Sequence, residues 1–541
     1  MVYLCKCECS AHTVVQVLTY MTDHNDTSDK IVTDGGEVTR EEASFVEYGI
    51  EDRPPLGESI LLGLQHYLTM IGATVAIPLI LAGAMEMPAA ETARLVGTFF
   101  VVSGIATLLQ TTVGNRYPIV QGGTFALLAP ALAIIGAMGT GWEATILELQ
   151  GAVIAAATVQ VLLGYVGALG KLKYYLSPVV IAPVIVLIGL SLVGTADVTR
   201  ADQNWWLLGL TLFLIVLFSQ YLDQYNRYAK LFPVLLGVVV AWLTATLLSV
   251  AGIYGPETLG YVDTGAIADA SAIQIITPLQ WGMPQFTLAF AIGMFAGVMA
   301  SMIESMGDYY AVARIAGVGA PSEKRINHGI GMEGIGNIIA GIMGTGNGST
   351  SYGENIGAIG ITGVASRYVV QIGAIVMLLV GFIGYFGALI TTIPGPIVGA
   401  LYIAMFGQIA AVGLSNLKYV DLDASRNAFI IGIALFLGLA IPEYMANVGS
   451  ASAFQEITSG AAVIGPVLGQ KIVSDTIYVF GSTTMAVGGT VAFVLDNTVR
   501  GTRKERGLEQ WEHLTEDNDE FVTFFERMRS SGEQKPVDKA D

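Results

Sequence analysis

Four ionisable side chains in or beside the long apolar runs of the sequence stand out. Glu304 and Asp308 stand four residues apart in one such run, so a helix would place both carboxylates on the same face. Glu354 follows a stretch rich in glycine and hydroxyl side chains, and His66 interrupts an apolar run near the start of the chain. An ionisable residue within a bilayer costs about 2.5 kcal/mol or more, so it usually serves a function. These four residues are the first candidates for a binding site.

Two neighbouring carboxylates could accept paired N–H donors from a planar heterocycle, because each carboxylate accepts several hydrogen bonds. We assign this role to Glu304 and Glu354. Phe125, which follows Thr124, could supply a ring face for stacking. Backbone N–H groups at the starts of short helices could meet ring carbonyl oxygens. This combination of acceptors, donors and a flat apolar wall suits a ligand with the shape of a nucleobase.

Each of these residues also has a structural interpretation. Glu304 could be a packing acid held by serine or backbone groups, and His66 could be a structural histidine linked to Asn355. Asp308 fits a coupling role or a solvated position near the inner end of its helix. Phe125 fits packing as well as stacking. The sequence leaves these alternatives open.

Two stretches are expected to break the helices that carry this site. Residues 346–363 begin with glycine, serine and asparagine and turn apolar, with helical spacing, only from Glu354 onward. Irregular backbone at membrane depth survives only where protein buries it or where it lines a wet cavity. We therefore expect an extended segment that leads into a short half-helix, and a glycine-rich external loop is the alternative. Pro118–Phe125, which contains Gln121, interrupts an earlier apolar run in a similar way.

The composition indicates a polytopic membrane protein. Of 541 residues, 53% are hydrophobic and 13% are charged, whereas soluble domains are about 25% charged. The mean hydropathy is +0.61. The net charge of −18 is concentrated in residues 21–58 and 502–541, which we expect to be solvated and partly disordered. Nucleic acid is not an expected partner, because the chain has no basic patch of the needed kind.

All three cysteines lie within residues 5–9, in a spacing that matches no four-ligand zinc site. We therefore expect no metal and no cofactor beyond a coupling ion, H⁺ or Na⁺. Residues 1–20 differ in character from the acidic run that begins at Met21. Met21 is thus the expected start of the native chain, with Met1 as the alternative.

Apolar segments divide the chain into two series of seven predicted spans, which makes the expected fold an all-α bundle of fourteen. The first series runs roughly over 59–84, 93–113, 119–138, 146–168, 174–194, 204–221 and 230–253. The second runs over 285–306, 327–345, 354–363, 367–389, 396–414, 427–443 and 476–496. Lysine and arginine gather in alternate loops, so the positive-inside rule places both termini in the cytoplasm of a plasma-membrane protein.

The two series also share their irregularities. The third and tenth segments both open with a small, polar interruption, and the first and eighth both carry polar residues in mid-span, Gln65-His66 and Glu304. An odd number of spans in each half would insert the second half upside down. This 7+7 inverted repeat is typical of secondary transporters.

At this point the motifs resemble those of a known family. Glu354-Asn-Ile-Gly357, followed by Thr362-Gly363, fits the signature of the nucleobase–ascorbate transporter family, also called nucleobase:cation symporter family 2, which includes proteins similar to uracil and xanthine permeases and to solute carrier family 23. The pair Gln65-His66, the eighth-span motif Glu304–Tyr310 and the third-span motif Gln121–Phe125 resemble further family motifs. The likeness covers about residues 55–508.

The resemblance implies a core domain and a gate domain. Spans 1–4 and 8–11 would form the core over 56–168 and 285–390, and spans 5–7 and 12–14 the gate over 169–254 and 391–498, with an external loop at 255–284, an acidic segment at 1–55 and a cytoplasmic tail at 499–541. It also implies substrate between the broken third and tenth spans, and a homodimer formed through the gate.

The resemblance further implies a role for each motif residue. Glu304, Glu354, Phe125, Thr124 and Gly357 would form the substrate site, and His66, Asp308, Asn355, Gln65 and Gln121 would support it or tune coupling. Family members for ascorbate tend to carry proline at the position of Glu354, so glutamate favours a nucleobase such as uracil or xanthine.

Four other functions are alternatives to nucleobase transport. Ascorbate transport and a sulfate- or bicarbonate-type anion transporter of the same architecture are the nearest alternatives, and the two predicted mid-span glutamates argue against the anion transporter. An enzyme is not expected, because the sequence shows no nucleophile–base pair, metal cluster or phosphate loop. A passive channel fits a pair of broken helices less well than a gated carrier does.

Overall fold

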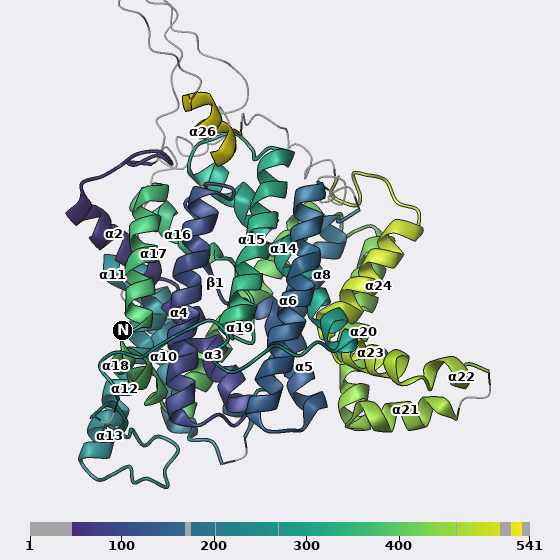
Figure 1. Ribbon diagram of the computed structural model, residues 1–541, viewed down its shortest axis with the longest axis horizontal. Coiled ribbons are helices and arrows are strands. Elements are labelled where there is room, and N and C mark those ends of the chain that lie inside the picture. The colour runs from purple at the N-terminus through teal and green to yellow at the C-terminus, as the bar shows by residue number, and fades with distance from the viewer. Residues whose placement is uncertain are drawn as a thin grey trace, which may run out of the picture. The chain divides into compact units, whose positions relative to one another are not determined.

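The computed structural model describes residues 46–167, 175–200, 202–268, 270–460, 463–508 and 521–532 (Figure 1). The predictions for the first 45 residues, including the start at Met21 and the cysteines, lie outside these ranges. In the first half of the chain the helices are α2 Leu56–Leu68, α3 Ile71–Ala84, α4 Ala89–Thr112, η1 Phe125–Leu127, α5 Leu128–Met138, α6 Trp142–Val166, α8 Pro178–Ser191, α9 Ala196–Thr199, α10 Trp205–Val216, η2 Leu217–Tyr221, α11 Arg227–Leu231, α12 Pro233–Val250 and α13 Gly265–Ala268.

The second half continues in the same style. Its helices are α14 Leu288–Ile315, α15 Glu323–Met343, α16 Gly353–Thr362, α17 Arg367–Gly381, α18 Gly384–Thr391, α19 Gly395–Ser415, η3 Asn416–Tyr419, α20 Ser425–Val448, α21 Ala451–Ser459, α22 Gly465–Leu468, α23 Lys471–Gly481, α24 Thr484–Thr498 and α26 Phe524–Gly532. Two short strands, β1 Gln121–Gly122 and β2 Thr350–Ser351, complete the elements of the described ranges.

Six of the described helices are long and apolar enough to cross a membrane alone, and two bent pairs would raise that number to eight. The helical, apolar character expected from the composition is therefore confirmed. The count of fourteen spans and the 7+7 repeat stay predictions, because several predicted segments fold as shorter helices.

Two predicted segments form sharply bent pairs of helices. The first, 59–84, bends by 47° between α2 and α3, and the last, 476–496, bends by 90° between α23 and α24. Gly481 and Ser482 stand at the second bend, where small residues commonly allow a helix to turn. Hydropathy predicted continuous spans here because it measures apolarity over a window and not direction.

The helices pack in two groups. Helices α4, α6, α15 and α17 pack against one another and against α2 and α18, whereas α8, α10, α12, α19, α20 and α24 pack together. Helix α14 contacts α6 and α15 on one side and α8, α23 and α24 on the other. The predicted domain boundaries stay predictions.

Glycines allow two of the closest helix contacts. A Cβ on Gly63 of α2 would lie 2.7 Å from the backbone nitrogen of Gly373 in α17, and a Cβ on Gly164 of α6 would lie 2.5 Å from that of Gly331 in α15. Both distances are too short for a real side chain. Small residues that let backbones approach are typical of helix packing in membranes.

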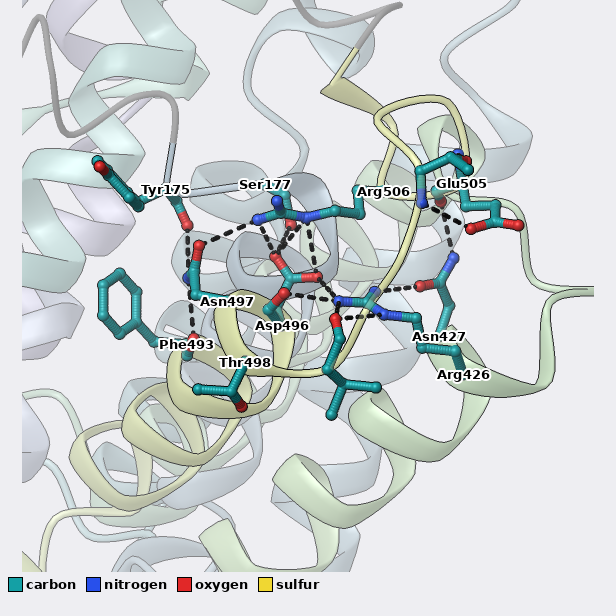
Figure 2. A network of polar contacts seen from close by, with 12 residues as sticks. Tyr175, Ser177, Arg426, Asn427, Phe493, Asp496, Asn497, Thr498, Glu505 and Arg506 are labelled. Carbon is teal, nitrogen blue, oxygen red and sulfur yellow. Dashed lines mark hydrogen bonds and ion pairs between the residues drawn. The ribbon is translucent and has the colours of Figure 1, made fainter.

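A buried carboxylate joins the elements of the second group (Figure 2). Asp496 in α24 is 1% exposed and accepts hydrogen bonds from Arg426 at 2.9 Å, from Arg506 at 2.7 Å and from Ser177 at 2.7 Å. These partners come from the start of α20, from the chain after α24 and from the residue before α8. One side chain thus holds three segments together at this end of the bundle.

Replacing Asp496 with alanine should strongly destabilise the protein. Arg426 and Arg506 would keep their charges while losing their main partner, and breaking a buried pair in this way costs about 3–5 kcal/mol. We expect a clearly lower melting temperature for the purified protein. Asp475→Ala is the matched control, because it removes a pair with the well-exposed Lys471 that is worth about 1 kcal/mol or less. Equal shifts for the two variants would contradict the role given to Asp496.

Candidate functional site

The two broken segments meet through a short antiparallel pairing. Gln121 lies opposite Ser351, and Gly122 lies opposite Thr350. After β1 the chain forms η1 and α5, and after β2 it forms α16. An extended segment that leads into a short helix is therefore confirmed at both places. The alternative of an external loop at 346–353 is wrong, because residues 346–352 are all buried.

Three asparagine side chains bind the irregular backbone. Asn347 accepts a hydrogen bond from the Thr124 backbone nitrogen at 2.8 Å and donates to the Thr124 carbonyl oxygen at 3.1 Å. Asn337 accepts from the Ser349 backbone nitrogen. Asn355 accepts from the Val120 backbone nitrogen at 2.9 Å. These amides form hydrogen bonds with backbone groups that would bond to one another in a regular helix. Irregular backbone inside a membrane needs such partners, because no water is there to supply them.

Glu304 and Asp308 on α14 face the start of α16, where Glu354 lies in the first turn. Helix α14 packs against both β2 and α16. Glu304 lies within electrostatic range of Glu354, and Asp308 lies within range of both. One Asp308 carboxylate oxygen is 3.3 Å from the position that a Cβ on Gly353 would take. The structure thus brings together the three carboxylates that the sequence singled out, and it packs Asp308 against α16 instead of placing it in solvent.

A fourth carboxylate, Glu333 on α15, joins this cluster and was missed by the sequence analysis. It is 2% exposed and lies within electrostatic range of Glu304. Ser305 donates to it at 2.6 Å, and longer bonds of 3.4 Å come from Ser301 and Ser351. The signal was present, because Glu333 stands inside the predicted ninth span and the rule for intramembrane acids applies to it equally.

His66 and Asn355 form the link that is expected if His66 is a structural histidine. Asn355 Nδ2 and His66 Nδ1 are 3.1 Å apart in a hydrogen bond, and both residues are buried. Asn355 therefore joins α2, the segment before β1 and α16. Gln65 precedes His66 on α2 and is partly buried. Any coupling role for this pair stays a prediction.

Of the other predicted site residues, Gln121 and Thr124 hold the broken segments in place, whereas Phe125 and Gly357 lie where they could border a ligand. Gln121 donates to Ser351 at 2.9 Å, and the Thr124 hydroxyl accepts from the Ala126 backbone nitrogen, so both hold the broken segments in place. Phe125 is 8% exposed and contacts Phe406 of α19 edge to face, at 5.7 Å between ring centroids. Gly357 faces open space, since a Cβ there would meet no atom within 4 Å.

Two apolar cavities lie apart from the carboxylates. One, of about 320 Å³, is lined by residues of α8, α14, α23 and α24 and of the chain just before α8; the other, of about 270 Å³, is lined by residues of α3, α12, α18 and α19 and the residue Ile393 between the last two. Thr490 is the one side chain with a hydroxyl or charge among their lining residues. Neither contains the hydrogen-bonding groups that a polar substrate needs.

Broken helices that bring carboxylates together inside an apolar bundle define a membrane permease. Residues 57–446 match the family profile Xan_ur_permease, described as "Permease family". The chain belongs to this family, the nucleobase–ascorbate transporters, and is an integral membrane protein.

Relatives from animals and plants extend the match over most of the chain. Human solute carrier family 23 member 2 is 41% identical over 511 residues, which is 86% of this chain and 76% of that protein. Rat solute carrier family 23 member 1 is 40% identical, over 88% of this chain and 84% of that protein. Nucleobase-ascorbate transporter 1 of Arabidopsis thaliana is 34% identical, over 90% of this chain and 96% of that protein.

Solved structures with a similar fold include transporters of anions. The transmembrane domain of the cyanobacterial bicarbonate transporter BicA superposes with a TM-score of 0.50 at 15% identity, over 71% of this chain and 96% of that domain. The murine anion transporter Slc26a9 gives 0.51 at 12% identity, over 80% of this chain and 70% of that one. At such identities the likeness shows the fold alone.

Replacing Asn355 with alanine should loosen the junction of the broken segments. The Val120 N–H and the His66 ring nitrogen would lose a partner in a buried place, which costs about 1–3 kcal/mol. We expect a lower melting temperature and faster hydrogen exchange at Val120. Asn447→Ala, which removes an exposed bond within α20, is the control. An unchanged exchange rate at Val120 would show that Asn355 does not hold this segment.

Proposed function

We propose that this permease is a secondary active transporter that carries a nucleobase, such as uracil or xanthine, together with H⁺ or Na⁺ across the plasma membrane. The observation that supports the proposal is that Glu304 lies within electrostatic range of Glu354, which stands in the first turn of the half-helix after β2. Carboxylates bind N–H donors strongly, and nucleobases present such donors along a flat edge. Phe125 and the open space beside Gly357 lie on the two half-helices that flank the junction of the broken segments.

Charge at the site favours an uncharged substrate over an anion. The charged neighbours that act on Glu304 and Asp308 are other carboxylates. Two buried arginines, Arg116 and Arg367, instead pair with Glu51. An ascorbate or sulfate ion would add negative charge to a cluster of four acids, which disfavours both as substrates. Ascorbate is the second candidate substrate after a nucleobase, and it would need a cation to accompany it. Anion transport is a property of BicA and Slc26a9 and does not carry over to this chain at such low identity.

The same excess of negative charge supports cation coupling. Several ionised acids are unstable together in an apolar bundle, because burial and mutual repulsion disfavour their charges. A proton on one of them would remove a charge, and a bound metal cation would offset it. Glu333 is the best candidate to carry that cation, because serine hydroxyls surround it and two of them, Ser301 and Ser305, also bond Thr350 at 2.9 and 3.0 Å. Binding of the cation would then strengthen binding of the substrate, and the reverse.

We propose alternating access by an elevator-type movement, which the division of the helices into two groups supports. One group of helices carries both half-helices and the acids and would slide against the other, with α14 and Phe125 at the contact between them. We further propose that both termini are cytoplasmic, that the second group forms a homodimer contact, and that the protein catalyses no chemical reaction.

Removing either negative charge should abolish uptake without unfolding the protein. Glu304→Gln and Glu354→Gln keep the shape of the side chain but lose the strong acceptor, so uptake of the base should fall at least tenfold. Initial rates in proteoliposomes measure this. Glu148→Gln is the matched control, since Glu148 is a buried acid of α6 that bonds Thr287 away from the junction. Normal uptake by Glu304→Gln would refute the proposed site.

A ligand screen should identify the substrate and the coupling ion. The purified protein is heated with uracil, xanthine, hypoxanthine, adenine, ascorbate or sulfate, with and without sodium. A ligand that binds only the folded state adds about 2.7 kcal/mol of stability at a hundred times its Kd. We expect a base to raise the melting temperature. If ascorbate or sulfate alone does so, the role given to Glu354 is wrong.

A further inference from the structure

The larger of the two apolar cavities lies in the angle of a bent helix pair. Phe480, near the end of α23, and Met485, near the start of α24, both line it, and the chain bends by 90° between these two helices. Helix α23 packs against α14, whereas α24 packs mainly against α20 and α8. The bend thus spreads the two helices apart and leaves a space of about 320 Å³ between α8, α14 and α24.

Helix α14 turns different faces to this cavity and to the carboxylate cluster. Ile292, Ala296 and Ile303 line the cavity, and their spacing places them on one face of the helix. At 3.6 residues per turn, Glu304 and Asp308 are rotated away from that face by roughly a third of a turn or more. The cavity is therefore a separate place from the proposed substrate site.

The lining of the cavity suits an apolar occupant. Thr490 is the one lining residue with a hydroxyl group, and none of the lining residues carries a charge. A cavity lined by aliphatic and aromatic side chains stays dry and takes apolar molecules, and one of about 150 Å³ is known to hold benzene. The space of about 320 Å³ is larger, so it can accept a longer apolar chain.

The lipid bilayer is the nearest source of such a chain. Ile292 is 36% exposed, and Thr490 is exposed as well, so the cavity opens at the side of the bundle. The chain is an integral membrane protein, and α14 is one of the helices long and apolar enough to cross the membrane. An acyl chain that enters from the bilayer loses no contact with water, and it restores the dispersion contacts that the lining of an empty cavity lacks.

The second cavity has the same construction. Its lining includes Ile71 and Gly72, just after the bend between α2 and α3, and Val239, which is 40% exposed on α12. The first cavity is lined by the predicted fifth, eighth and fourteenth spans, and the second by the predicted first, seventh, eleventh and twelfth. In a 7+7 repeat, the first, seventh and twelfth spans are the counterparts of the eighth, fourteenth and fifth. The two cavities then occupy equivalent places, which indicates a feature of the architecture and not a local packing defect.

We propose that the larger cavity is a binding site for one acyl chain of a membrane phospholipid. The chain enters beside Ile292 and lies between α14 and α24, in the angle of the bend before Met485. There it contacts α14 on one side and helices of the second group on the other. The site lies apart from the carboxylates, so its test needs no measurement of uptake.

Photocrosslinking tests the site in the full-length protein. The protein is placed in nanodiscs of phosphatidylcholine that include a phosphatidylcholine with a diazirine on one acyl chain, and it is irradiated and digested for mass spectrometry. Ile303 and Met485 are 9% and 2% exposed, so only a chain inside the cavity can label them as strongly as it labels Leu247, which is 70% exposed on α12. We expect comparable labelling at all three. Labelling confined to outward-facing residues such as Leu247 would overturn the proposal.

Variants that fill the cavity provide the matched comparison. Ala486→Phe places a ring in the cavity from α24, and Ala296→Phe does so from α14. Each should lower labelling at Ile303 at least fivefold and leave labelling at Leu247 unchanged, so one variant suffices if the other does not fold. Ala440→Phe, the same change at an exposed position of α20, is the control and should change neither. If a folded cavity variant is labelled at Ile303 like the wild type, or if Ala440→Phe lowers that labelling equally, no acyl chain binds in this cavity.

Discussion

The structure depends on satisfying irregular backbone inside an apolar bundle. Where α5 and α16 begin, the chain is extended and cannot bond to itself, and no water of a bilayer core could serve in its place. The protein meets this need by pairing β1 with β2 and by aiming the side chains of Asn337, Asn347 and Asn355 at the backbone. The bond of Asn337 is local, but the strand pairing and the bonds of Asn347 and Asn355 join residues from the two halves of the chain. The junction is therefore held only when both halves of the chain have folded.

That junction has a chemical consequence. Two half-helices that start side by side present free N–H groups and positive dipole ends to the same small region. Carboxylates are tolerated there, and four of them gather around it on α14, α15 and α16. Serine hydroxyls stabilise one, Glu333, while Glu304 lies within electrostatic range of Glu354. A polar site of this kind could not stand on the lipid-facing side of either helix group.

The contact between the helix groups is of a different kind from the packing within them. Within the first group, helices approach through glycines, as Gly63 and Gly373 show. Between the groups, α14 and Phe125 contact the other side, and two apolar cavities of about 320 and 270 Å³ remain. Loose packing favours sliding, because interdigitated side chains resist it.

The sequence by itself determined the class of the protein and named most of the candidate site. Hydropathy, the glycine-rich interruptions and the acids in apolar runs are local features, and they predicted a membrane bundle, the two broken segments, and Glu304, Asp308 and Glu354 as partners. Only the tertiary structure decided what depends on residues far apart in the chain. It brought Glu333 into the cluster, made Asn347 a backbone partner, bent the helix pairs α2–α3 and α23–α24, and docked α26 on Lys324. The physical reason is that apolarity and residue type are read along the chain, whereas direction, pairing and charge contact arise only when distant segments pack together.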